Sequence, residues 1–160
     1  MTWHGDSDMA TVRLLTGNYA GTGNNVGWSS ENGMFDNKYG KGHMFHASDC
    51  SAHGQGVNVI FNDPITLDDF IIHTRRDCCM EVQYRKVCLY ADEVKIACTP
   101  SSDYTPGQAI NFMDFRISGT FPITASSFKL QWDGPADCAQ IEELFIDYTS
   151  EPSTTGPGET

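Results

Sequence analysis

The stretch HTRRDCCMEV, residues 73 to 82, places two cysteines side by side behind two arginines and an aspartate. Consecutive Cα atoms lie about 3.8 Å apart, whereas an ordinary disulfide spans roughly 4.4–6.8 Å between its Cα atoms. Cys78 and Cys79 therefore bridge each other only through a distorted turn. Geometry alone favours thiols that point to opposite faces of a strand, unpaired or paired elsewhere. The alternative is a strained ring formed by the two neighbours.

The chain is long enough for one domain with a proper core, because it has 160 residues. It carries 10 Lys and Arg against 21 Asp and Glu, a net charge of −11 with His neutral. Such an acidic chain repels phosphate backbones and anionic lipids. We therefore expect neither nucleic acid nor an anionic membrane as a partner.

Six cysteines, an even number, are typical of an oxidising compartment, so we expect a secreted, extracellular protein. The opening MTWHGDSDMA has neither the basic nor the apolar segment of a signal peptide, and we interpret its Met as a replacement start. Residues 150–160 are rich in Ser, Thr, Pro and Gly. They predict a linker to further modules of a larger extracellular protein, after one domain at 1–149.

Hydrophobic residues recur with a period of two, and no sustained helical period appears. The alternation predicts strands at 57–61, 69–74, 82–90, 94–98, 109–117, 128–132 and 141–148. Turn residues separate them, including Asn62-Asp63-Pro64 and Asp133-Gly134-Pro135. Many short strands divided by such turns predict an all-β jelly roll or sandwich. Residues 17–56 are Gly/Asn-rich with little strand pattern, and a loop region of that length is usually functional.

The strand pattern narrows the cysteine pairings. Cys88 and Cys98 flank a predicted hairpin turn, which favours a bridge between them. A bridge between Cys50 and Cys138 would close a long loop, worth about 4–5 kcal/mol in the chain-entropy model. That would leave Cys78 and Cys79 for each other, although their geometry alone favours the open alternative.

The run from Arg75 to Glu81, RRDCCME, resembles the R-G-D-C-C-x-E-R core of the F-type, fucose-binding lectins. These lectins belong to the galactose-binding-like, discoidin-type jelly rolls. GMFDNKYG (33–40) resembles their D-G-N calcium loop, and QIEELFIDY (140–148) resembles their last strand. The resemblance spans most of residues 10–149, and only the Arg-x-Asp-Cys-Cys core is specific. It implies a calcium-stabilised lectin that binds a neutral glycan, such as a fucoside or galactoside on a glycoprotein.

The resemblance also implies roles for the residues of the core. A vicinal Cys78–Cys79 disulfide would offer a flat apolar ring against the sugar. Arg75, expected to be exposed, would donate to sugar oxygens through its planar fork, with Asp77 beside it. From the residues alone, Arg75 and Asp77 could instead form a salt bridge at a strand end.

Three positions depart from the lectin pattern. Arg76 replaces the Gly of the motif, and Val82 stands where the second sugar-binding Arg is expected, with Arg85 as a substitute if the loop shifts register. Ser48 stands where the family His is expected. Its replacements in order of preference are His53 and His46, although a lone loop histidine is more often a solvated surface residue. These departures motivate a second hypothesis, a discoidin-like protein-binding or adhesion module that has lost the sugar site.

The resemblance implies a Ca²⁺ site made of backbone carbonyls between 35 and 49 together with Asp36, Asn37, Ser48 and Glu143. From the residues alone, Asp36 could form an Asx turn and Glu143 could lie on a solvated strand face. However, Glu142-Glu143 interrupts an apolar strand, where a carboxylate is costly unless it has a partner. No arrangement of residues indicates catalysis, so we expect a binding domain and not an enzyme.

Overall fold

The chain folds into a sandwich of antiparallel strands in this computed structural model, which describes residues 1–15, 32–39, 43–46, 54–76, 86–100, 105, 107–132 and 139–150. Its strands are β1 (Thr2–Trp3), β2 (Ala10–Leu14), β3 (Phe45–His46), β4 (Gly56–His73), β5 (Val87–Ala91), β6 (Val94–Cys98), β7 (Ala109–Asn111), β8 (Ile123–Trp132), β9 (Gln140–Ile141) and β10 (Glu143–Ser150). Two 3₁₀ helices, η1 (Asn32–Phe35) and η2 (Phe112–Phe115), complete the described elements. Within these ranges no helix is long and apolar enough to cross a membrane.

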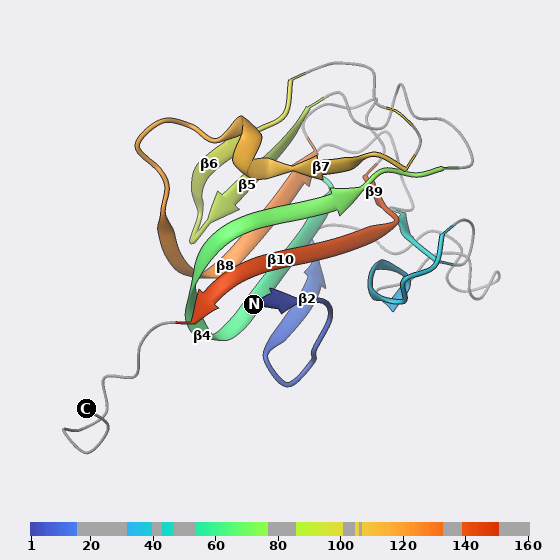
Figure 1. Ribbon diagram of the computed structural model, residues 1–160, viewed down its shortest axis with the longest axis horizontal. Coiled ribbons are helices and arrows are strands. Elements are labelled where there is room, and N and C mark those ends of the chain that lie inside the picture. The colour runs from blue at the N-terminus through green and yellow to red at the C-terminus, as the bar shows by residue number, and fades with distance from the viewer. Residues whose placement is uncertain are drawn as a thin grey trace.

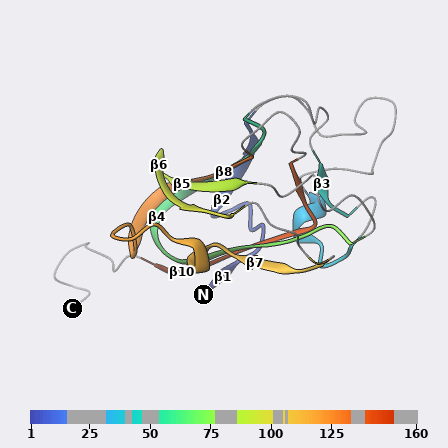
Figure 2. The ribbon, with the colours of Figure 1, turned by 90° about the horizontal axis from the view of Figure 1, so that it is seen from above.

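The strands pair in the order β1-β10-β4-β8-β5-β6, with β2 and β7 also paired to β4, and β3 pairs separately with β9. Strand β4 belongs to both layers. Its first half pairs with β2 and β8, and its second half pairs with β10 and β7, with the β8 pairing continuing only as far as Leu67. Figure 1 shows β4 curving around one end of the molecule, and Figure 2 shows the two layers from above. The predicted all-β sandwich is confirmed.

The bend of β4 corrects one prediction. Asn62-Asp63-Pro64 does not separate two strands but lies exposed inside one strand, where pairing with β8 is interrupted between Ile60 and Ile65. Proline has no N–H to donate to a sheet, so it is tolerated at such an irregularity. The same residues that predicted a turn therefore bend a continuous strand from one layer into the other.

The predicted strand 109–117 is also too long. Strand β7 ends at Asn111, and η2 follows it. The carboxylate of Asp69 accepts hydrogen bonds from the Asn111 side chain at 2.8 Å and from the Met113 backbone N–H at 3.1 Å. A side chain that takes a backbone N–H in this way competes with the sheet ladder. The chain returns to a sheet contact only at Arg116, which bridges Ala97.

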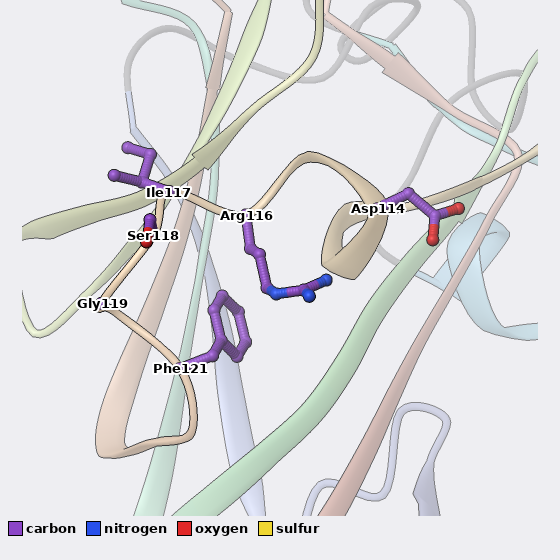
Figure 3. A pocket seen from close by; sticks show the side chains of 6 residues that line it. All are labelled: Asp114, Arg116, Ile117, Ser118, Gly119 and Phe121. Atoms are coloured by element: carbon purple, nitrogen blue, oxygen red, sulfur yellow. The ribbon is translucent and has the colours of Figure 1, made fainter.

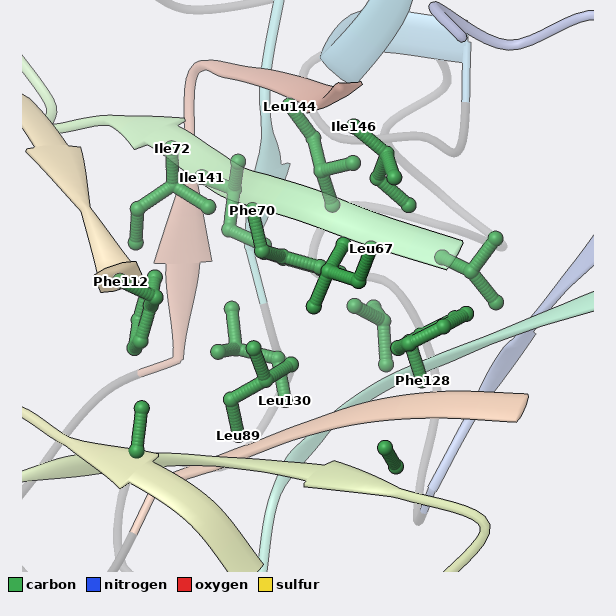
Figure 4. Packing of buried hydrophobic residues seen from close by; sticks show 14 of the residues in the cluster. Leu67, Phe70, Ile72, Leu89, Phe112, Phe128, Leu130, Ile141, Leu144 and Ile146 are labelled. Atoms are coloured by element: carbon green, nitrogen blue, oxygen red, sulfur yellow. The ribbon is translucent and has the colours of Figure 1, made fainter. Parts of the chain in front are cut away.

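The core lies between the two layers and follows the predicted alternation. Val57, Val59 and Phe61 of β4 face it, as do Phe128, Leu130 and Trp132 of β8 and Leu144, Ile146 and Tyr148 of β10. Figure 4 shows Leu67, Phe70 and Ile72 from the second half of β4 opposite Leu89 and Leu130. Burial of these side chains, about 1.5–3 kcal/mol for each, is the main stabilising contribution to the fold.

Candidate functional site

Four segments meet at one end of the sandwich, which we call the loop end: residues 32–39, 43–46, 73–76 and 139–143. Strand β4 finishes there at His73, and β10 begins there at Glu143, directly opposite His73 in the ladder. Within residues 43–46, the strand β3 pairs with β9. Gly33 lies so close to Met44 that an added Cβ would be 2.4 Å from its backbone nitrogen. This close approach holds η1 against the segment that leads into β3.

Glu143 is the centre of a polar cluster at the loop end. Its side chain is fully buried, and its Oε1 accepts the backbone N–H of Asn37 at 3.0 Å and lies 2.8 Å from Nε2 of His4. Asn37 has φ of 57°, a left-handed conformation that asparagine tolerates better than most residues. The interpretation of Glu143 as a residue on a solvated strand face is therefore wrong.

Asp36 lies beside Glu143 and has partners of its own. Its Oδ1 accepts the backbone N–H of Lys38 at 2.9 Å, which is the Asx turn, and its Oδ2 lies 2.8 Å from Nδ1 of His43. Burial alone would raise the pKa of Asp36, but the His43 contact and the Lys38 N–H outweigh burial and hold it below 3.8. Asp36 is therefore the charged member of the carboxyl pair.

The pKa of Glu143 moves in the opposite direction. Burial, joined by repulsion from the Asp36 charge, raises it from 4.5 to about 8, although the Asn37 N–H opposes the change. Burial also lowers the pKa of His4 below 6.5. At neutral pH, without a cation, both members of the His4–Glu143 contact are therefore uncharged.

The pair of carboxyl groups fits a hard cation. Within the described ranges Oε2 of Glu143 is buried without a hydrogen-bond partner, and Asp36 places a second carboxylate beside Glu143. Carboxylate and carbonyl oxygens are the ligands that Ca²⁺ takes. Among the residues described, no group of three His, Cys, Asp or Glu side chains is arranged around a metal position. Backbone carbonyls, and residues outside these ranges such as Ser48, would have to complete the coordination shell.

Arg75 follows the end of β4 and is not the exposed residue that the sequence predicts. Only 9% of its surface is accessible, and its Nη1 donates to Oε1 of Gln140 at 3.1 Å. Gln140 lies opposite His46 in the β3–β9 ladder. The register thus brings together Arg75, Gln140 and His46, the second-choice histidine of the sequence analysis. The short β9 strand, which contacts β4, supplies this hydrogen-bond partner.

Arg76, the residue after Arg75, has different surroundings. The backbone N–H of Arg76 donates to Oε1 of Glu142 at 2.8 Å, and its Nε lies 3.9 Å from the other carboxylate oxygen. Its guanidinium lies 3.6 Å from the ring centroid of Tyr39, an exposed aromatic residue. Glu142 is itself fully buried. Arg76 therefore partners Glu142, a carboxylate in an apolar stretch for which the sequence indicated no partner.

Sequence reasoning missed several members of the loop end: His4, Tyr39, His43, Gln140 and Glu142 as a partner of Arg76. His4 and Glu143 are 139 residues apart, so no local pattern could connect them. The i+2 spacing of Asp36 and Lys38 was readable as an Asx turn. For Tyr39, the only signal was an aromatic residue in a Gly/Asn-rich loop.

The Cys88–Cys98 disulfide is confirmed, since the two residues are direct partners in the β5–β6 ladder and are bonded. The remaining predicted site residues lie outside the described residues. They are Ser48, Cys50, His53, Asp77, Cys78, Cys79, Arg85 and Cys138.

No protein-family model matches the sequence, and no curated protein matches it. Solved structures do match. A fucolectin from striped bass (Morone saxatilis) serum superposes with a TM-score of 0.68 at 12% identity, covering 91% of this chain and 49% of that one. The family 32 carbohydrate-binding module of Clostridium perfringens NanJ, in complex with galactose, gives 0.58 at 17% identity and covers 88% and 93%.

A fucose-binding module of Streptococcus pneumoniae gives a TM-score of 0.59 at 11% identity, covering 88% of this chain and 94% of that one. The chain spans about half the length of the striped bass lectin. At these identities the likeness concerns the fold alone: this chain shares the β-sandwich fold of these carbohydrate-binding modules.

Proposed function

We propose that this domain is a secreted, calcium-stabilised module that binds a neutral glycan at its loop end, with no catalytic role. The observation that carries the proposal is the placement of Arg75. Its guanidinium is held by Gln140, which pairs with His46, and it lies two residues before the Asp77-Cys78-Cys79 stretch. A planar fork fixed at the end of a strand is suited to bidentate contacts with hydroxyl and ring oxygens.

The fold supports the same proposal. The solved neighbours include a lectin described as a fucolectin, a module in complex with galactose and a module described as fucose-binding. A fucoside or a galactoside is therefore the first ligand to test. In the proposed site, Arg75, Asp77 and a histidine at position 46 or 53 make polar contacts, Arg85 substitutes for the missing second arginine, and the Cys78–Cys79 ring stacks against the sugar.

Calcium has a structural part in this proposal. The ion would be held by Asp36 and Glu143 together with Asn37, Ser48 and backbone carbonyls. Its positive charge would balance the negative charge of the carboxyl pair. Glu143 is bonded to Asn37 and His4, so an occupied site would fix the 36–39 segment and the N-terminal strand against β10. In this proposal the ion stabilises the loop end, and the residues of the chain determine its shape.

Two observations favour a second candidate, a discoidin-like protein-binding or adhesion module without a sugar site. Arg75 has only 9% of its surface accessible, which leaves little of its guanidinium for a ligand, and Val82 occupies the position of a second arginine.

A glycan array with the calcium-loaded protein tests the two candidates. Binding to fucosides or galactosides that the free sugar competes away supports the lectin. Silence across both classes contradicts it and supports the adhesion module. Repeating the array after chelation separates a role of calcium in binding from a role in stability alone.

A further inference from the structure

Two hollows lie side by side on the flank of the sandwich, between η2, the 116–122 loop and the second half of β4. Their volumes are about 380 and 340 Å³, within the range of roughly 300–1,000 Å³ for small-molecule sites. The first is lined by Asp114, Arg116, Ile117, Ser118, Gly119 and Phe121. The second shares Arg116 and Phe121 with it and adds residues of β4. These two side chains form the common wall, and we call the pair of hollows the flank site.

Arg116 is held in place although its side chain is exposed. Its Nη1 donates to the carbonyl of Met113 at 2.9 Å, and its backbone bridges Ala97 of the edge strand β6. In the described part of the chain no carboxylate forms an ion pair with it. A guanidinium has five donors, so most of them remain available to a ligand in the hollows.

Phe121 supplies the apolar part of the wall. The ring is half-buried and packs against the core, yet it lines both hollows. Figure 3 shows the Arg116 side chain and the Phe121 ring pointing toward one another from the two ends of the 116–121 segment. A ring fixed by the core on one side offers a preformed apolar surface on the other.

A carboxylate supplies the acceptor, because Asp68 lines the second hollow. Asp114 lines the first hollow from η2, and Figure 3 shows its carboxylate pointing away from Arg116 and Phe121. Asp68 is the extra residue of a bulge in β4, because Leu67 pairs with Tyr148 while Asp69 pairs with Asp147. Its Oδ2 accepts the hydroxyl of Thr149 at 3.1 Å, which orients the carboxylate at the mouth of the hollow. Bulges often redirect a side chain in this way.

We propose that the flank site binds a neutral saccharide, separate from the loop end. A sugar needs donors, acceptors and an apolar surface together, and Arg116, Asp68 and Phe121 supply one of each. Two carboxylates against one guanidinium make the site unfavourable for phosphate, sulfate or an acidic sugar. The site lies roughly 20 Å along β4 from the loop end, at about 3.3 Å for each residue from Leu67 to His73.

The proposal does not depend on the loop-end lectin. If both sites bind, one domain contacts a branched or multivalent glycan at two points, and avidity exceeds the affinity of either site when the glycan spans them. If only one binds, the other is unaffected, because no described hydrogen bond or ion pair joins the two regions.

The test is a titration of the full chain followed by NMR. Methyl glycosides of galactose, fucose, glucose, mannose and N-acetylglucosamine are added one at a time up to about 10 mM, since monosaccharide affinities in the millimolar range correspond to only about 4 kcal/mol. We expect at least one to shift the Nε–H of Arg116 and the backbone amides of Ser118 and Gly119. Arg116→Ala should weaken binding, as read from the Ser118 and Gly119 amides, about tenfold or more, whereas Arg13→Ala, at an exposed arginine of β2, should not change it.

The loop end provides the second control. Arg75→Ala should leave the flank response unchanged, and Arg116→Ala should leave any loop-end response unchanged, so failure of one proposal is distinguishable from failure of the other. The flank proposal is overturned if none of the five glycosides shifts Arg116, or if Arg116→Ala binds as the wild type does. It is also overturned if inorganic phosphate shifts Arg116 while every sugar is silent.

Discussion

The backbone N–H of Asn37 donates a 3.0 Å hydrogen bond to the buried carboxyl of Glu143, joining a Gly/Asn-rich loop to the start of the last strand. Both residues belong to the calcium site that the sequence predicts, and the fold brings them into contact. The same carboxyl lies 2.8 Å from His4 of the N-terminal segment. A change at Glu143 should therefore affect three segments that are remote in sequence.

Calcium should stabilise the wild type through this carboxyl. A ligand that binds only the folded state adds about 2.7 kcal/mol at a hundredfold excess over its Kd. Thermal melts should show a lower Tm in chelator and recovery with Ca²⁺. Glu143→Gln should lose the calcium response, whereas Glu93→Gln, at an exposed carboxylate paired with Lys129, should keep it. A calcium response retained by Glu143→Gln would contradict the assignment.

The stability of the chelated protein should depend on pH through Glu143. Its pKa is about 8 in the folded state against an ordinary 4.5, so the folded state holds a proton that the unfolded state releases. The contribution of the protonated Glu143 carboxyl to the free energy of unfolding is fully present below pH 4.5 and is lost as the pH rises to about 8. The groups that face Glu143 are His4, Asp36 and, through Asp36, His43.

The measurement is the free energy of unfolding of wild type minus that of Glu143→Gln, from pH 4.5 to 8. Subtraction is needed because the pKa values of His4 and His73 are lowered by burial, which makes stability rise with pH in part of the same window. We expect the difference to fall steadily as the pH rises. A flat difference would show that Glu143 is ionised throughout.

Arg75→Ala should lower stability as well as any glycan affinity. The side chain is 9% accessible and hydrogen-bonded to Gln140, so its loss should cost about 1–3 kcal/mol of unfolding free energy. If Arg75 contacts sugar, affinity should fall about tenfold to a hundredfold. Arg75→Lys should recover little, because a point charge does not reproduce the planar fork.

Calorimetric titration beside a thermal melt separates the two effects, with Arg13→Ala as the control for loss of a positive charge at an exposed site. Intact glycan affinity in a folded Arg75→Ala variant would remove Arg75 from the sugar site. The residue would then have only the structural role that its burial indicates.

Removal of the Cys88–Cys98 disulfide should destabilise the sandwich. The bridge closes a loop with a sequence separation of 10, which the chain-entropy model values at about 2–3 kcal/mol. A Cys88→Ala, Cys98→Ala double variant should lose about that much in urea unfolding. Because the two residues remain partners in the β5–β6 hairpin, the variant should still fold. A variant as stable as the wild type would show that the bridge adds nothing to the hairpin.

The local pattern of the sequence determined which residues face the core. Val57, Val59 and Phe61 alternate with polar neighbours, and a period of two leaves one choice of inward face wherever one side of a sheet is buried. The Cys88–Cys98 pairing was also readable, because a short hairpin sets its own register.

Only the tertiary structure decided how these strands meet at the loop end. The sequence did not show that Asn62-Asp63-Pro64 bends one strand instead of ending it, since the outcome depends on which strand pairs on each side of the bend. Nor did it show that Arg75 is buried, and its hydrogen-bond partner Gln140 lies on β9, 65 residues further along the chain. The charge state of Glu143 depends on contacts with residues 106 and 139 positions away. Desolvation and charge proximity are properties of distance in space, and a periodic pattern records only distance along the chain.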